Sequence, residues 1–145
     1  MVFVRTVKIE DIKKVMKIAE ISLKEVYNEE LFLNLYSAWN TGFYVAVRDK
    51  AVVGFVCGTI MPGDQARILM LAVHPLHRRH GIGSSLVDVF IERCVMNDMK
   101  FVVLEVRHTN QLAINFYLNR NFRPVETIDD FYTNGESALK MVKHL

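Results

Sequence analysis

Residues 69–95 constrain the fold more than any other part of this chain. Their pattern predicts an apolar strand, a basic loop that contains Arg78 and Arg79, and an amphipathic helix. The free N–H groups and the dipole at a helix start attract a phosphate. Gly81 and Gly83 let the backbone approach phosphate oxygens, because neither residue places a Cβ in the way. The segment therefore predicts a strand–loop–helix unit that binds a diphosphate.

Two other phosphate-binding loops do not match this segment. A P-loop needs a lysine after its second glycine, but Ser84 follows Gly83. A dinucleotide-binding turn needs a third glycine, and Leu86 stands at that position.

Length and charge limit the remaining possibilities. The chain has 145 residues, and we expect residues 1–145 to form a single domain. Lys and Arg together number 18 against 16 Asp and Glu, a net charge of +2, so we expect no nucleic-acid partner. No run approaches the roughly 18 apolar residues of a membrane span, and the apolar start is too short for a signal peptide. We expect no membrane partner and a cytoplasmic location.

Cysteine and histidine spacing does not indicate a metal site. Cys57 and Cys94 lie far apart in apolar runs, so we expect both to be small buried hydrophobes. His74, His77 and His80 repeat every third residue, but their polar loop has no acidic or cysteine partner nearby, and we expect no metal.

The order of predicted elements indicates a mixed sheet with helices on its faces, an α/β or α+β three-layer domain. Asp11 is expected to cap the first helix and Asn110 the last one, while Asn134-Gly135 predicts the turn of a final hairpin. The predicted strands are 2–6, 43–47, 52–60, 67–73, 101–106 and the two arms of the final hairpin, and the predicted helices are 12–19, about 29–39, 84–95 and 111–118.

The loop and a second segment together resemble a known family. Arg78, Gly81 and Gly83 fit the pattern [RQ]-x-x-G-x-[GA] of the GNAT superfamily, the N-acetyltransferases that hold the diphosphate of acetyl-CoA in this loop. Glu105 and Tyr117 have the spacing of the bacterial and archaeal N-terminal protein acetyltransferases. Asn110, between them, fits the same subgroup, as does the C-terminal end from Phe131 to Met141.

This resemblance implies a mostly antiparallel sheet of about seven strands, with acetyl-CoA as co-substrate and a protein or peptide N-terminus as acceptor. Asn121 stands where the family commonly has glycine, and asparagine tolerates the left-handed conformation. Tyr27, Glu29 and Tyr132 are the implied acceptor-binding residues. The implied cofactor-binding residues are Leu71, Ala72, Val73, Arg78, Arg79, His80, Gly81, Ile82, Gly83, Ser84, Asn110 and Tyr117.

The resemblance also implies the catalytic roles of Glu105 and Tyr117. Glu105, the one charge in the run 101–106, would act as a general base through a water, and the alternative is an ion pair with Arg107 on the same face. Tyr117 would donate a hydrogen bond, or a proton, to the leaving thiolate. The alternative is a core aromatic like its neighbour Phe116.

We expect direct transfer in a ternary complex, with strand residues 71–73 splayed from their neighbour to meet the cofactor. An α-amine with a pKa near 8 is about a tenth neutral at pH 7, whereas a lysine near 10.4 needs roughly 4–5 kcal/mol for deprotonation. This favours protein N-termini. Two alternatives stay open. One is an acetyltransferase for lysine or for a small amine. A small-amine acceptor would need an acidic pocket built from Glu29, Glu30 and Asp130. The other is a non-catalytic acetyl-CoA sensor.

Overall fold

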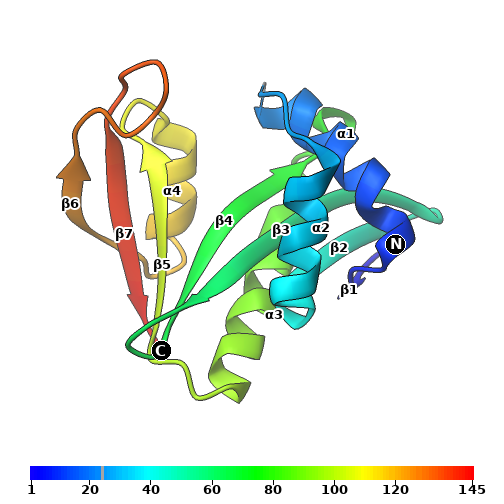
Figure 1. The fold of residues 1–145 in the computed structure, drawn as a ribbon, viewed down its shortest axis with the longest axis horizontal. Helices are drawn as coiled ribbons and strands as arrows, with labels where there is room; N and C mark the ends of the chain where they lie inside the picture. Colours follow the sequence, from blue (N-terminus) through cyan, green and yellow to red (C-terminus); the bar gives the residue numbers. More distant parts are fainter. Residues whose placement is uncertain (24) are drawn as a thin grey trace.

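The computed structural model describes residues 1–23 and 25–145 of the chain. Within them, seven strands and four helices follow one another in the order expected from the sequence (Figure 1). The strands are β1 Val2–Thr6, β2 Phe43–Arg48, β3 Ala51–Met61, β4 Gln65–Val73, β5 Phe101–Arg107, β6 Arg123–Ile128 and β7 Ala138–His144. The helices are α1 Ile12–Leu23, α2 Glu29–Ala38, α3 Ile82–Met96 and α4 Gln111–Leu118.

The strands form one sheet with the order β1-β2-β3-β4-β5-β7-β6. All neighbours are antiparallel except β4 and β5, which are parallel. Side chains of α1 and α2 pack with one core cluster, whereas those of α3 and α4 pack with another on the opposite face. The three-layer, mostly antiparallel fold predicted from the sequence is therefore confirmed.

The parallel pair β4–β5 separates shortly after it begins. Gln65–Arg67 lie in register with Phe101–Val103, and the register ends there although both strands continue (Figure 1). A bulge at Leu69 shifts the register between β3 and β4, which increases the local twist and bend. The divergence leaves residues 71–73 splayed from β5, as expected. We call this opening the β4–β5 fork.

Large apolar side chains hold a helical layer to each face of the sheet. On α3, Leu86, Phe90 and Cys94 lie one turn apart and are fully buried. Cys57, on β3, is fully buried in the other cluster, so the expectation for both cysteines is confirmed.

One local expectation was wrong, and another is confirmed with a longer connection. Asp11 does not cap α1: it ends a 3₁₀ turn, and its carboxylate accepts hydrogen bonds from the Arg5 guanidinium at 2.7 and 3.0 Å and from the Lys8 N–H. The final hairpin is confirmed, since β6 and β7 are antiparallel neighbours, but their pairing stops at Ile128–Ala138 and Asn134-Gly135 does not join them directly. The Gly135 turn, closed by its N–H to the Tyr132 carbonyl, lies instead within the longer loop 129–137.

Gly58 lies beside the bulge, where the backbone of β4 approaches closely. A Cβ at this position would overlap the Arg67 carbonyl oxygen and lie 2.6 Å from the Phe90 ring. We expect Gly58→Ala to lower the free energy of unfolding by about 1–3 kcal/mol, measured by urea denaturation.

Gly83→Ala is the matched control, because its Cβ would meet no atom closer than 3.8 Å and lies in a helix. We expect it to leave stability unchanged or raise it by up to about 1 kcal/mol. Equal losses in the two variants would contradict the close approach at Gly58.

Candidate active site

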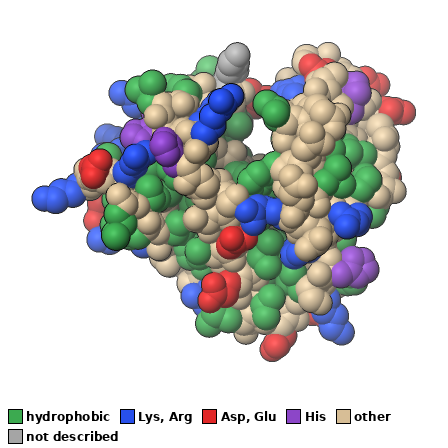
Figure 2. All heavy atoms as spheres, turned by 180° about the vertical axis from the view of Figure 1, so that it is seen from behind, with side chains coloured by type: hydrophobic (Ala, Val, Ile, Leu, Met, Phe, Trp, Pro, Cys, Tyr) green, Lys and Arg blue, Asp and Glu red, His purple; other side chains and the backbone are tan. Residues whose placement is uncertain are grey.

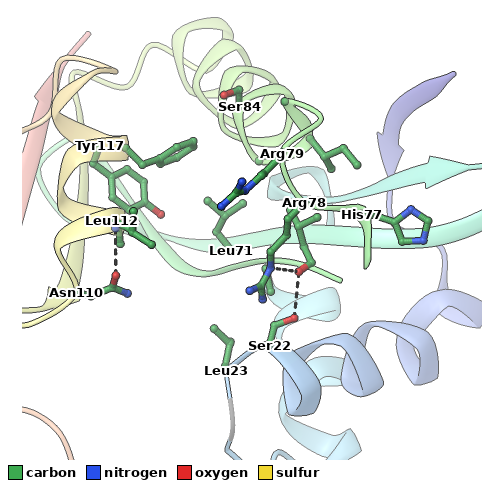
Figure 3. A pocket seen from close by; sticks show the side chains of 17 residues that line it. Ser22, Leu23, Leu71, His77, Arg78, Arg79, Ser84, Asn110, Leu112 and Tyr117 are labelled. Atoms are coloured by element: carbon green, nitrogen blue, oxygen red, sulfur yellow. Dashed lines mark hydrogen bonds between the residues drawn. The ribbon is translucent and has the colours of Figure 1, made fainter. Parts of the chain in front are cut away.

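A cavity of about 560 Å³ lies where the end of β4, the start of α3 and the side of α4 meet (Figure 3). Seen from behind, basic and histidine side chains gather on one side of a deep notch between the two halves of the molecule (Figure 2). The cavity is lined by Ser22, Leu23, Leu71, Ala72, Val73, His77, Arg78, Arg79, Gly81, Ile82, Gly83, Ser84, Asn110, Leu112, Ala113, Phe116 and Tyr117.

The start of α3 offers free donors to this cavity. Gly81 precedes the helix in the left-handed conformation, with φ of +73°, and a Cβ there would meet no atom within 4 Å. The first backbone hydrogen bond of the helix joins the Ser85 N–H to the Gly81 carbonyl. The N–H groups of residues 82–84 come before this bond and therefore have no partner within the helix. Arg79 lies beside them. These donors and this cation fit the diphosphate of acetyl-CoA.

Arg78 has a second role, because it helps to hold the end of β4. Its Nε donates a hydrogen bond to the Val73 carbonyl at 3.0 Å, and the Ser22 hydroxyl donates to the same oxygen at 3.2 Å (Figure 3). The two bonds tie α1 and the loop to the edge of β4 at the fork.

Eleven of the twelve residues implied for the cofactor line this cavity, and His80 is the exception. His80 is exposed in the loop, while His77 lines the cavity instead. Sequence reasoning also missed Ser22, Leu23 and Leu112, which carry no motif. Asn110 caps α4, as expected, and accepts a hydrogen bond from the Ala113 N–H at 3.1 Å.

A second cavity, of about 460 Å³, lies beside the first, and the two share Leu23, Leu71, Asn110, Ala113 and Tyr117. It is also lined by side chains of α2 and of the α1–α2 connection, from the sheet face opposite α3 and α4. The lining residues are Leu23, Glu25, Tyr27, Leu31, Leu35, Ile68, Leu69, Met70, Leu71, Leu104, Glu105, Val106, Arg107, Asn110, Ala113, Tyr117 and Tyr132. The two cavities therefore meet at the β4–β5 fork.

Tyr117 lies where the cavities meet. Its side chain extends from α4 toward Leu71 (Figure 3), and the residue is only 7% exposed. Burial raises the pKa of Tyr117 well above its usual value, so its hydroxyl remains a hydrogen-bond donor at neutral and mildly alkaline pH. Its ring packs edge-on against Phe116 and Phe122, which fixes its direction.

Glu105 forms an ion pair, but its partner is Arg67 and not Arg107. The Arg67 guanidinium holds both carboxylate oxygens, at 2.6 and 3.0 Å, and the Glu105 side chain is 8% exposed. Arg67 reaches Glu105 from β4, the other arm of the fork. Arg107 instead bonds to Glu25 at 3.0 Å and lies over the Tyr132 ring at 4.0 Å.

Tyr27 and Tyr132 line the second cavity, whereas Glu29 does not. Glu29 is exposed in the first turn of α2, and Glu25 lies at the cavity in its place. The Tyr27 hydroxyl donates to Glu25 at 3.2 Å, and burial together with this carboxylate raises the pKa of Tyr27 to about 12. Glu30 and Asp130 line neither cavity, so the acidic pocket that a small-amine acceptor would need is not formed by the residues named for it.

Residues 1–23 and 25–145 contain no group of three His, Cys, Asp or Glu side chains that could hold a metal ion. The helices of that same part are too short or too polar to cross a bilayer.

The model of the acetyltransferase (GNAT) family matches residues 11–122. The chain belongs to this family. This GNAT chain is 33% identical over 142 residues to an uncharacterized N-acetyltransferase of Methanocaldococcus jannaschii, with 97% of this chain and 90% of the relative covered. An N-alpha-acetyltransferase of Saccharolobus solfataricus is 29% identical over 154 residues, covering 97% and 92%. The crystal structure of Ard1 from Thermoplasma volcanium superimposes with a TM-score of 0.95 at 35% identity, covering 99% and 97%.

The protein is therefore an acetyl-CoA-dependent N-acetyltransferase, with acetyl-CoA as its co-substrate. This activity leaves the sensor alternative without support.

Gly81 allows a test of the diphosphate site that separates charge from shape. Asn and Asp have the same size, and both tolerate the left-handed conformation and cap a helix start. We expect Gly81→Asp to weaken acetyl-CoA binding at least tenfold more than Gly81→Asn, because its carboxylate would repel the diphosphate. Isothermal titration calorimetry measures both affinities.

Neither variant should lose thermal stability without ligand. Equal acetyl-CoA affinities for Gly81→Asp and Gly81→Asn would show that the diphosphate does not bind at the start of α3.

Proposed function

We propose that this GNAT enzyme acetylates the N-terminal α-amine of a protein or peptide. The observation that carries the proposal is the pair of cavities that meet at the fork, with Glu105 on the second and the free N–H groups of α3 on the first. A cofactor and an acceptor can therefore approach from opposite faces of the sheet. The N-alpha-acetyltransferase relative supports the same acceptor class.

Acetyl-CoA supplies a thioester carbonyl as the electrophile. Glu105 receives the proton of the attacking amine through a water at one carboxylate oxygen. Each carboxylate oxygen has two lone-pair sites, so the bonds from Arg67 leave room for such a water. Arg67 fixes the direction of the carboxylate, which is the geometric requirement for a general base.

The Tyr117 hydroxyl stabilises the leaving sulfur by donating a hydrogen bond. The pKa of Tyr117 is raised by burial, so complete transfer of its proton to a thiolate, whose ordinary pKa is about 8.5, is uphill. Beyond Arg67, the edge of β4 faces the fork rather than β5, so N–H groups on this edge can polarise the thioester carbonyl.

A base that works through one water suits an α-amine better than a lysine. At pH 7 the free energy needed to deprotonate an α-amine with a pKa near 8 is about 3 kcal/mol lower than that needed for a lysine. Direct attack in a ternary complex then needs no covalent enzyme intermediate.

Residues 1–145 act in this proposal as one catalytic domain, since a single sheet spans β1 to β7. We also propose the cytoplasm as its location, where acetyl-CoA and new protein N-termini occur together.

Paired peptides test the acceptor class directly. One peptide has a free N-terminus and no lysine, and its partner has a blocked N-terminus and one internal lysine. We expect the first to react at least 100-fold faster at pH 7.5, because its amine is more readily neutral. Mass spectrometry locates the acetyl group. Comparable rates on the blocked peptide would identify a lysine acetyltransferase instead.

Substitution of Glu105 tests the base. We expect Glu105→Gln to lower kcat/KM about 100-fold near pH 7 and less near pH 9, where more of the amine is already neutral. Thermal unfolding of the same variant separates this effect from the loss of the Arg67 ion pair. A variant that is merely less stable, with a normal rate at every pH, would exclude Glu105 as the base.

Tyr117→Phe removes only the hydroxyl. We expect kcat to fall at least tenfold while the acetyl-CoA affinity stays within a factor of three, because the ring and its aromatic contacts remain. Steady-state kinetics measures kcat, and isothermal titration calorimetry measures the acetyl-CoA affinity. An unchanged kcat would leave Tyr117 as a packing residue.

A further inference from the structure

One wall of the second cavity is apolar and incompletely covered. Leu31 and Leu35 lie one turn apart on α2, and both line the cavity. Leu69, at the bulge of β4, and Met70 line it from the sheet. Leu31 is 38% exposed and Leu69 41%, so apolar surface from two elements faces the same space. Tyr27 completes the wall, with its ring against Phe32. We call these five residues, Tyr27, Leu31, Leu35, Leu69 and Met70, the apolar wall.

The apolar wall shares the cavity with Glu105 and Tyr117. An acceptor amine that attacks at the fork therefore places the carbon that bears it in this cavity. In an N-terminal residue that carbon carries the side chain, whereas the corresponding carbon of a lysine is an unsubstituted methylene. An apolar surface beside the amine can therefore contact the side chain of an N-terminal residue when that side chain is apolar.

The charged groups of the cavity, and the Tyr27 hydroxyl beside the apolar wall, are already paired. Glu105 is held by Arg67, Arg107 by Glu25, and the Tyr27 hydroxyl donates to Glu25. A polar first side chain placed against the apolar wall would lose water without gaining a hydrogen-bond partner there. A large apolar side chain would cover Leu31 and Leu69 and gain their contact.

We propose that the apolar wall selects acceptors whose first residue is large and apolar, such as Met, Leu or Phe, over those that begin with Ala, Ser or Gly. This inference rests on the proposed N-terminal acetylation and names the substrate class within it. The occupant of the wall is the first side chain of the acceptor, because the wall is continuous with the catalytic residues of the same cavity.

A set of peptides that differ only in the first residue tests the selection, with the full chain and saturating acetyl-CoA. We expect kcat/KM to be at least tenfold higher for peptides beginning with Met, Leu or Phe than for those beginning with Ala, Ser or Gly, as for other hydrophobic subsites. Equal rates, or a preference for the small residues, would overturn the proposal.

Two variants assign the selection to the wall. Leu31→Gln and Leu69→Gln change partly exposed side chains, so both proteins should fold. We expect each to lower the Leu-to-Ala ratio of kcat/KM at least threefold. Val95→Gln is the matched control: Val95 is an exposed apolar residue of α3 that lines neither cavity, and its ratio should equal that of the wild type. A wild-type ratio in both wall variants would overturn the assignment.

The same peptides distinguish this proposal from the one on which it rests. If all free N-termini react equally, N-terminal acetylation stands and the apolar selection fails. If only a blocked peptide with an internal lysine reacts, N-terminal acetylation fails and the selection fails with it.

Discussion

The end of pairing between β4 and β5 is the constraint on which the site depends. Only the first residues of the two strands lie in register, from Gln65–Phe101 to Arg67–Val103, and the bulge at Leu69 bends β4 away from its neighbour. Continued pairing would fill the fork with a backbone ladder. It would then separate the cavity beside α3 and α4 from the one beside α2. The two cavities meet only because the pairing of β4 with β5 ends, and the proposed reaction occurs at that point.

The Arg67–Glu105 ion pair spans this break close to where it begins. Arg67 is the last β4 residue in register with β5, and Glu105 lies two residues beyond its partner Val103. A nearly buried carboxylate without a partner would be strongly unfavourable, whereas a bidentate guanidinium satisfies it and fixes its direction. The same contact thus holds the two arms of the fork together and orients the group that we propose as the base.

Local patterns predicted most of the fold. The strand–loop–helix segment around Gly81 and the order of elements follow from periodicity and from glycine, and Asn121 adopts the expected left-handed conformation. Long-range pairing was less accessible. Arg107 was the nearest cation to Glu105 along the chain, but the fork brings Arg67 from another strand. An arginine within the apolar strand 67–73 was the available signal for that partner.

The acceptor side was the least predictable part of the site. Glu25, and not Glu29, lines the second cavity. Glu29 is the first residue of α2, and its side chain is exposed in the first turn of that helix. Leu31, Leu35 and Leu69 carry no motif and look like ordinary core positions in the sequence. They become recognisable only in the folded protein, where α2 and β4 line one cavity and leave these side chains partly uncovered.

A crystal structure with a conjugate that joins CoA to the N-terminus of a peptide tests the central claim most directly. The expected result places the diphosphate at residues 81–84, the peptide on the α2 side of the sheet, and the linkage in the fork between Leu71 and Tyr117. A conjugate bound with both parts on one face of the sheet, or with its linkage outside the fork, would contradict the account.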